Sequence, residues 1–468
     1  MKFSSFFLLL FIINISFILS SEDEFIPLKP GNGILNQPYN HTSNEKNLFF
    51  IFLNLRHGAR SPLSLNKKHN DILGGKWKSN SELTSLGIKQ HYIIGNLNKE
   101  RYSSFIKEEY DPKEIKIYST PFPRTIMSVA SELLGFYNNN SYPNSFNYSD
   151  IDLNEKDIND IDSRIIPPIQ LFTFNENNNK FDRIFKNHFE CKYMRNQVKE
   201  NWEIPHEEIN SIISNFNNEY SEIIGKEFKN INLDLLKTPK YFDTFCDVFL
   251  SLYFDKDSQY ILQKIIKYGK DLNKIKDMCD DFLYKQFIYI RNGGIAEKNP
   301  LISISPIITK IIKWMKLRAD KNNNFAPDYE EPKLVIYSGH DSTLFQMQTF
   351  LKICFNIEVE KTEFASTQLM ELRKYGRIYY VEIYYNDKLK MNITFDQFYN
   401  IVNKNIISEN EINEKCYGIR NSIYFSKFLM LLLIAGILFI SFIFLNVWVC
   451  FKGENVKSEK VPKIIMIN

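Results

Sequence analysis

The chain has 468 residues, of which 44% are hydrophobic and 15% aromatic, and this composition excludes a protein that is disordered throughout. Its 58 basic and 55 acidic residues give a net charge of +3, which provides no reason to expect a nucleic-acid partner. The 6 cysteines show no C-x-x-C or similar spacing, so their pattern predicts no metal site.

The first 20 residues have the pattern of a secretory signal peptide. One positive charge at Lys2 precedes an apolar stretch from Phe6 to Leu19, and small residues follow it. A retained signal anchor is the alternative, but the stretch is short for a membrane span. We expect cleavage near Ser20 or Ser21.

A second apolar segment, residues 428–451, carries no charge and is long enough to cross a membrane as a helix. Residues 452–468 contain four lysines against two glutamates, which favours a cytoplasmic tail. The sequence therefore predicts a single-pass type I membrane protein whose residues 21–427 lie in the lumen or outside the cell. Four Asn-x-Ser/Thr sequons for glycosylation agree with this topology: Asn40, Asn139, Asn147 and Asn392.

Short apolar runs that alternate with helical patterns indicate an α/β core with a largely parallel sheet flanked by helices. The expected strands are residues 47–55, 114–118 and 333–337. Each is followed by apolar residues at helical spacing, which predict helices at residues 84–101, 124–136 and 342–353, the first capped by Thr84. We assign residues 47–137 and 333–400 to this core.

A different kind of segment separates the two parts of the core. Residues 138–162 are rich in Asn, Asp and Ser and are typical of a surface loop. Apolar residues then recur at helical spacing within 206–229, 257–291 and 306–318. We therefore predict a mostly helical insertion over residues 163–319, followed by a polar linker.

The first expected strand ends in Arg56-His57-Gly58-Ala59-Arg60. Loops that leave the carboxyl ends of strands line the ligand crevice of an open α/β sheet. Arginine side chains suit phosphate oxygens, and a histidine between two of them is a candidate nucleophile in an anion pocket. Their positive field should lower the pKa of the histidine and keep its imidazole neutral.

The other two strand ends supply matching chemistry. Arg124 opens a helix after the second strand, where a helix N-terminus favours anions. After the third strand, His340 is followed by Asp341, whose carboxyl group is a candidate general acid. The remaining histidines are interpreted as surface or structural residues: His41, His69, His91, His188 and His206.

The motifs R-H-G-x-R-x-P at 56–62 and G-H-D at 339–341 resemble the signatures of the histidine acid phosphatases, of the lysosomal and prostatic type. Residues 82–92, 119–128 and 364–372 are similar to the same family. The resemblance covers most of residues 47–420, and the helical insertion matches least clearly. It implies a phosphoglycerate-mutase-like fold for residues 21–427.

The resemblance also implies a role for each site residue. His57 would attack phosphorus and become phosphorylated, and Asp341 would protonate the leaving alcohol, which predicts an acidic pH optimum. The phosphoryl oxygens would be held by Arg56, Arg60, Arg124 and His340. Neither a metal nor another cofactor is expected, because three guanidinium groups neutralise the charge of the phosphoryl group.

One departure from the family leaves the substrate open. Close family members often carry Asp at the position of Ala59, whereas phytases carry Ala. Phosphate monoesters of small molecules or phosphoproteins are therefore the first expectation, and phytase or inositol-polyphosphate phosphatase activity is the alternative. A receptor-like ectodomain without catalysis is a third hypothesis. The family analogy suggests a homodimer and a lysosomal, endosomal or cell-surface location.

The cysteines follow the family pattern in part. Cys191 and Cys416 resemble a family disulfide pair. Cys246 also resembles a paired cysteine, but Thr367 stands where its partner would be expected. The sequence leaves the pairing of Cys246, Cys279 and Cys354 open.

Overall fold

The structure is a computed structural model, which describes residues 47–63, 73, 77, 81–137, 170–171, 191–255, 260–291, 299–320, 332–417 and 420–455. The predicted signal peptide lies outside the described residues, as do residues 456–468 of the tail and the sequons at Asn40, Asn139 and Asn147.

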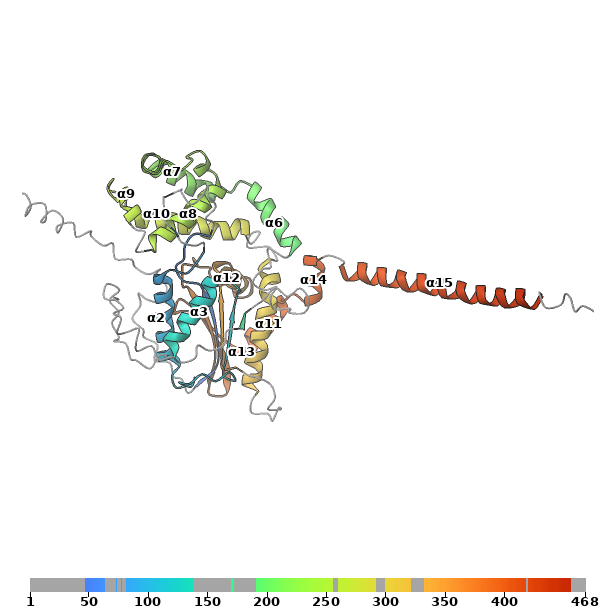
Figure 1. The fold of residues 1–468 in the computed structure, drawn as a ribbon. Coiled ribbons are helices and arrows are strands. Elements are labelled where there is room, and N and C mark those ends of the chain that lie inside the picture. Colours follow the sequence, from blue (N-terminus) through green and yellow to red (C-terminus); the bar gives the residue numbers. More distant parts are fainter. Residues whose placement is uncertain are drawn as a thin grey trace, which may run out of the picture.

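A seven-stranded sheet in the order β3-β2-β4-β1-β5-β6-β7 forms the centre of the fold (Figure 1). The strands are β1 Leu48–Arg56, β2 Ile115–Ser119, β3 Gln170–Leu171, β4 Leu334–Gly339, β5 Thr367–Tyr375, β6 Ile378–Tyr385 and β7 Lys388–Thr394. The pairs β3·β2, β2·β4 and β4·β1 are parallel, whereas β1·β5, β5·β6 and β6·β7 are antiparallel. The α/β class is confirmed, but the sheet is mixed and not largely parallel as expected.

The antiparallel half escaped the sequence analysis because tight turns, and not helices, connect its strands. Gly376, between β5 and β6, has a φ of +61°, a conformation that glycine adopts without strain. Asn386 and Asp387, between β6 and β7, both have positive φ values, as a two-residue hairpin turn of type I′ requires. A search for strands that alternate with helices passes over such hairpins.

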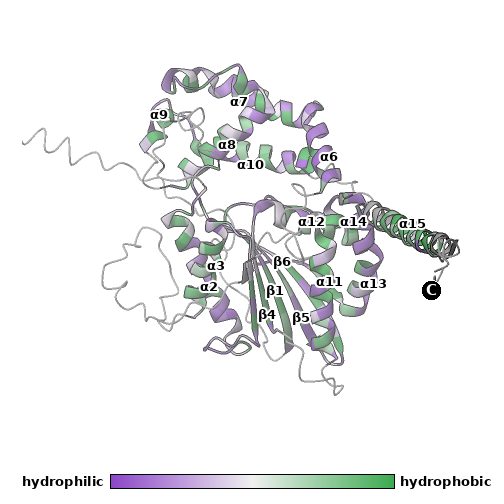
Figure 2. Ribbon diagram, turned by 45° about the vertical axis from the view of Figure 1, so that its right-hand side comes forward, coloured by the Kyte–Doolittle hydropathy of each residue, from purple (hydrophilic) through white to green (hydrophobic). Residues whose placement is uncertain are grey.

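Helices cover both faces of the sheet (Figures 1 and 2). On one face, α2 (Ser85–Tyr102) and α3 (Pro123–Phe136) share a core with Leu53 and its neighbours on β1. On the other, the residues of α11 (Asn299–Ala319), α12 (Asp341–Phe355) and α13 (Phe395–Asn405) share a core with Phe52. Burial on both faces explains why β1 reads as a continuous apolar run.

The helical insertion lies beyond the ends of the strands, on the side where the loop after β1 emerges (Figures 1 and 2). It contains α6 Lys192–Glu203, α7 Glu207–Glu227, α8 Pro239–Tyr253, α9 Gln263–Ile266 and α10 Leu272–Gln286, followed by a π-helical segment Phe287–Arg291. One assignment from the sequence needs correction, because α11 was expected in this insertion and instead packs against β1 and α12. The sequence pattern marks α11 as an apolar helix but does not tell which core that helix joins.

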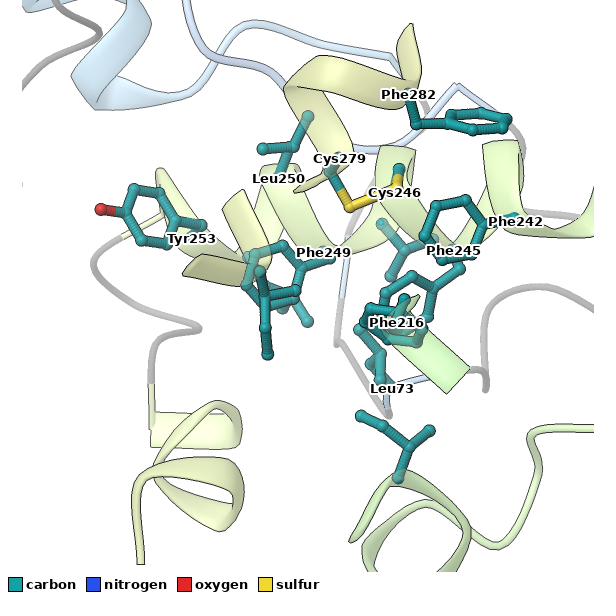
Figure 3. Packing of buried hydrophobic residues seen from close by; sticks show 14 of the residues in the cluster. Leu73, Phe216, Phe242, Phe245, Cys246, Phe249, Leu250, Tyr253, Cys279 and Phe282 are labelled. Atoms are coloured by element: carbon teal, nitrogen blue, oxygen red, sulfur yellow. A yellow bond between two sulfur atoms is a disulfide. The ribbon is translucent and has the colours of Figure 1, made fainter. Parts of the chain in front are cut away.

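The insertion has its own core, which surrounds a disulfide between Cys246 on α8 and Cys279 on α10 (Figure 3). Phe216, Phe242 and Phe245 pack beside it with ring centroids 4.9–5.9 Å apart. A second disulfide joins Cys191 to Cys416, which is the pair that the family resemblance implies. Cys354 is free, so the five cysteines that precede the apolar C-terminal segment are now assigned.

The C-terminal helix α15 (Arg420–Asn455) follows α14 (Glu409–Tyr417) and projects away from the rest of the protein (Figures 1 and 2). Its residues Phe428–Val449 form one helix long and apolar enough to cross a membrane, and none of this stretch is buried. Exposure of so many large apolar side chains to water would be unfavourable, which supports a lipid environment for this helix.

The disulfide in the insertion should contribute measurably to stability. Replacing Cys246 and Cys279 together by serine opens a loop with a sequence separation of 33 residues, and should lower the free energy of unfolding by about 3 kcal/mol because the unfolded chain gains entropy. Thermal unfolding of the full-length protein in detergent measures the effect. Cys354→Ala is the control and should shift the midpoint far less; equal midpoints for wild type and the double variant would contradict the prediction.

Candidate functional site

The register of the parallel strands brings three strand ends together. Arg56 at the end of β1 lies opposite Gly339 at the end of β4, and Ser119 at the end of β2 lies opposite Ser338. The three loops that follow therefore begin side by side. All six residues predicted from these loops meet in one place: Arg56, His57, Arg60, Arg124, His340 and Asp341.

The loop after β1 is held in shape by its backbone. Gly58 N–H donates to Ser128 Oγ at 3.1 Å, and Ala59 N–H donates to Gln90 Oε1 at 2.9 Å. Gly58 also touches the backbone of Gly87 on α2, so closely that a Cβ atom on Gly58 would lie 2.5 Å from the Gly87 carbonyl oxygen. Glycine is required here because no side chain fits between the loop and the helix.

His57 is buried, and its hydrogen bond fixes the tautomer of the ring. Nδ1 lies 2.9 Å from the carbonyl oxygen of Gly58. A carbonyl can only accept, so we assign the proton to Nδ1, which leaves a lone pair on Nε2. Burial, and then the charges of Arg124, Arg60 and Arg56, lower the pKa of His57 well below its usual value. The ring is therefore neutral even in acid.

Two of the three arginines are paired with carboxylates. Arg56 Nη2 lies 3.0 Å from Asp341 Oδ2, and Arg60 Nη2 lies 2.8 Å from Asp247 Oδ1. The guanidinium group of Arg56 also stacks over the ring of Phe364, 4.4 Å from its centroid. These contacts stabilise two positive charges that would otherwise repel each other at a buried position.

Arg124 reaches the same place from the first turn of α3. Its Nη2 donates to Nδ1 of His340 at 3.3 Å, and its Nη1 donates to Ser81 Oγ at 3.2 Å. Burial lowers the pKa of Arg124 to about 10, so the group keeps its charge at neutral and acidic pH. The Nε atoms of all three arginines are buried and have no hydrogen-bond partner, which leaves donors free for an anion.

His340 caps the N-terminus of α12, and its ring is edge-on to that of His57 with centroids 5.6 Å apart. Because Nδ1 accepts from Arg124, we assign the proton to Nε2, which lies 3.1 Å from Thr120 Oγ1. Burial and then Arg124 lower the pKa of His340 to about 3. This ring is neutral too, and in this state both its nitrogen atoms contact protein groups.

Asp341 is the first residue of α12, and its carboxyl group is ionised in this structure. Its Oδ1 accepts from Ser342 N–H at 2.7 Å, and its Oδ2 faces Arg56. Burial acts to raise the pKa of Asp341, but the charges of Arg56, Arg291 and Arg60 outweigh it and hold the pKa at about 2. A group that weakened the field of Arg56 would raise this pKa again.

Sequence reasoning missed the residues that the insertion and the segment before β5 contribute. Asp247 on α8 accepts from both Arg60 and the backbone N–H of Leu63. Lys276 on α10 pairs with Glu363 at 3.0 Å, next to Phe364. Asp247 lies 187 positions from Arg60 in the chain, so no local pattern could have indicated the pair. Phe364 falls within a segment whose family resemblance was noted, although no role had been assigned to it.

Comparisons with known proteins show what the chain is similar to. The family model of the histidine phosphatase superfamily (branch 2) matches residues 48–386. Lysosomal acid phosphatase of Homo sapiens is 25% identical over 351 residues, which cover 73% of this chain and 71% of that protein. Prostatic acid phosphatase of Bos taurus is 24% identical over 352 residues, covering 74% and 79%.

Among solved structures, the phytase from Citrobacter braakii superposes with a TM-score of 0.52, covering 77% of this chain and 98% of that chain. Its sequence identity is 12%, so this likeness concerns the fold alone.

The unpaired arginine donors should bind inorganic phosphate. We expect orthophosphate to raise the thermal unfolding midpoint of the wild type, because it binds the folded state only. Arg124→Gln should weaken phosphate binding by about tenfold or more, since a charge-assisted hydrogen bond is lost. Arg377→Gln, the same change at an exposed turn between β5 and β6, is the control and should bind like wild type. Equal phosphate affinity in both variants would contradict the assignment of Arg124 to the anion site.

Proposed function

Because the chain belongs to the histidine phosphatase superfamily (branch 2), we propose that it is an acid phosphatase that hydrolyses phosphate monoesters through a phosphohistidine at His57. The observation that carries this proposal is the state of His57. A buried neutral imidazole with its lone pair on Nε2 is surrounded by the charges of Arg56, Arg60 and Arg124. This arrangement suits a nitrogen nucleophile that attacks a phosphate ester.

In the first step, His57 Nε2 attacks phosphorus and the bond from phosphorus to the ester oxygen breaks. The arginines carry no reacting proton and stabilise the charge that spreads over the equatorial phosphoryl oxygens. Asp341 gives its proton to the leaving oxygen, so that an alcohol departs and not an alkoxide. His340 would contact a phosphoryl oxygen, which requires it to exchange one of its present hydrogen bonds.

In the second step, Asp341 acts as a base. It takes a proton from a water molecule whose oxygen attacks phosphorus, and the bond to His57 Nε2 breaks. Inorganic phosphate leaves, His57 returns to its neutral state, and Asp341 is protonated again. The charge required for both steps comes from guanidinium groups, so the proposed reaction needs no metal.

The ionised state of Asp341 connects substrate binding to acid catalysis. A bound phosphate anion pairs with Arg56 and Arg60, and this weakens the field that holds the pKa of Asp341 at about 2. The pKa of Asp341 therefore rises in the complex, and the carboxyl group takes up a proton at acidic pH. Activity should fall as the pH rises, whereas His57 stays neutral and does not limit the reaction in acid.

The charges beside Asp341 favour a simple monoester over a polyphosphate such as phytate. Asp243 and Asp247 both interact electrostatically with the groups of the site, and Arg291 pairs with Asp243 at 3.5 Å. When Arg291 and its neighbours are included, four arginines (Arg56, Arg60, Arg124 and Arg291) stand against three carboxylates (Asp243, Asp247 and Asp341), an excess of one positive charge among these described residues. That balance fits one phosphoryl group, whereas a polyphosphate would require further cations.

The location of the enzyme is part of the proposal. A signal peptide at residues 1–20 and a membrane helix within residues 428–451 would place the catalytic domain in a lysosomal or endosomal lumen or outside the cell. The tail, residues 452–468, would lie in the cytoplasm. Asn392 is exposed on the edge strand β7, where a glycosyltransferase could reach it.

Replacing His57 by alanine should abolish phosphatase activity. We expect kcat to fall by at least about a thousandfold, because removing the nucleophile leaves only binding and charge stabilisation. Rapid quenching into alkali after mixing with a radiolabelled substrate should trap phosphohistidine in the wild type and none in the variant. His206→Ala, the same substitution in the insertion, should keep wild-type turnover. Substantial turnover by His57→Ala would refute the proposed nucleophile.

Replacing Asp341 by asparagine should affect substrates according to their leaving groups. An alkyl phosphate needs a proton on its leaving oxygen, so its kcat should fall by about 100-fold or more. p-Nitrophenyl phosphate releases a stable anion and should lose far less in the first step. In the wild type, kcat for the alkyl phosphate should decline as the pH rises and Asp341 loses its proton, and this decline should be absent in the variant. Because the second step is common to both substrates, the losses are compared in the rate at which the phosphoenzyme forms, and equal losses in that rate would rule out a general acid at this position.

A further inference from the structure

A buried histidine and a buried glutamate lie directly behind the proposed nucleophile and face no substrate. His91 on α2 and Glu132 on α3 are 0% and 1% exposed. His91 Nε2 lies 3.1 Å from the carbonyl oxygen of Arg56, and its Nδ1 lies 3.3 Å from Glu132 Oε2. Asn98 Nδ2 donates to the other carboxylate oxygen at 3.1 Å. The pair thus ends on the peptide group that joins Arg56 to His57.

Two glycines press the helices of this pair together. A Cβ atom on Gly95 would lie 1.9 Å from the carbonyl oxygen of Glu132, and one on Gly135 would lie 2.1 Å from that of Tyr92. The backbones of α2 and α3 are therefore in direct contact one turn away from His91 and Glu132. This close crossing places the two buried side chains at hydrogen-bonding distance.

The peptide group between Arg56 and His57 is fixed from two directions. On one side, His57 N–H donates to the carbonyl oxygen of Gly339 on β4 at 3.1 Å. On the other, the Arg56 carbonyl meets His91. The orientation of this peptide plane determines the directions in which the side chains of Arg56 and His57 leave the backbone. A tilt of the plane would move the nucleophile and one phosphate ligand together.

The hydrogen bonds require a particular placement of protons. The Arg56 carbonyl only accepts, so His91 Nε2 must carry a proton. The contact between Nδ1 and the Glu132 carboxylate then needs one further proton between two groups that both have lone pairs. With this proton on either group, Nδ1–H donates to Glu132 or the carboxyl O–H of Glu132 donates to Nδ1, and in both cases His91 Nε2 keeps the proton that it donates to the Arg56 carbonyl.

We propose that His91 and Glu132 are positioning residues. They share one proton between His91 Nδ1 and Glu132, and the hydrogen bond from His91 Nε2 to the Arg56 carbonyl orients Arg56 and His57 toward the substrate. The inference rests on the proposed phosphatase function and adds two residues that do not touch the substrate. A displacement of about 1 Å in such a site can reduce turnover by about 100-fold. Because Arg60 and Arg124 are held by other groups, substrate binding should depend on the pair much less than turnover does.

Two substitutions of His91 separate positioning from packing. His91→Gln keeps a donor near the place of Nε2 and should retain kcat within about threefold. His91→Asn keeps only the side facing Glu132 and loses the donor to Arg56. We expect its kcat to fall by about 10–100-fold, while KM and orthophosphate affinity change less than about threefold. Both are measured on the full-length protein in detergent, with thermal unfolding recorded for each variant.

A second pair of variants tests Glu132 even if the His91 variants do not fold. Glu132→Gln can donate to Nδ1 and preserve the useful tautomer, so it should keep kcat within about threefold. Glu132→Leu has no polar group for His91 and should lose about tenfold or more. The inference is overturned if the wild type is active and His91→Asn or Glu132→Leu has the same kcat as the wild type. It is also overturned if both members of a pair lose kcat equally, which indicates packing alone. An inactive wild type would instead overturn the proposed function, and the inference with it.

Discussion

The gathering of three buried guanidinium groups around one neutral imidazole is the constraint on which this fold depends. Positive charges so close together repel each other, and burial removes the water that would screen them. Asp341 and Asp247 offset two of these charges, and the ring of Phe364 stacks on the guanidinium group of Arg56. The positive field that remains suits a phosphoryl group and, after burial, is the second cause of the lowered pKa that keeps His57 free of a proton. Charge balance and nucleophilicity therefore have one common origin.

The α/β core and the helical insertion hold different parts of this cluster. The sheet with α2 and α3 fixes the backbone of the loop after β1, through Gln90, Ser128 and His91. The insertion mainly holds side chains, because Asp247 on α8 orients Arg60, in addition to its bond from the Leu63 backbone, and Lys276 on α10 pairs with Glu363 next to Phe364. The disulfide between Cys246 and Cys279 joins α8 to α10, and so couples these two supports.

The sequence was sufficient for the α/β class, for strands β1, β2 and β4, and for the six residues that meet at the ends of these strands. These follow from local patterns, since an apolar run predicts a buried strand and its last residues predict the site. It was not sufficient for β5 to β7, which tight turns connect, or for the partner of Cys246. Asp247 and Glu132 were also missed, because the roles of these residues depend on contacts with segments remote in sequence. His91 was interpreted as a surface or structural residue from the sequence, and only its contacts with Glu132 and the Arg56 carbonyl indicate a positioning role.

The Cys191–Cys416 bridge gives the molecule a defined route for mechanical load. Cys416 lies in α14, twelve positions before the apolar stretch begins at Phe428, and Cys191 immediately precedes α6. A force on the C-terminal helix is therefore transmitted through the disulfide to the insertion as well as through the backbone to the sheet. A covalent bond at this point hinders separation of the insertion from the sheet, and so protects the candidate site from movements of the C-terminal helix.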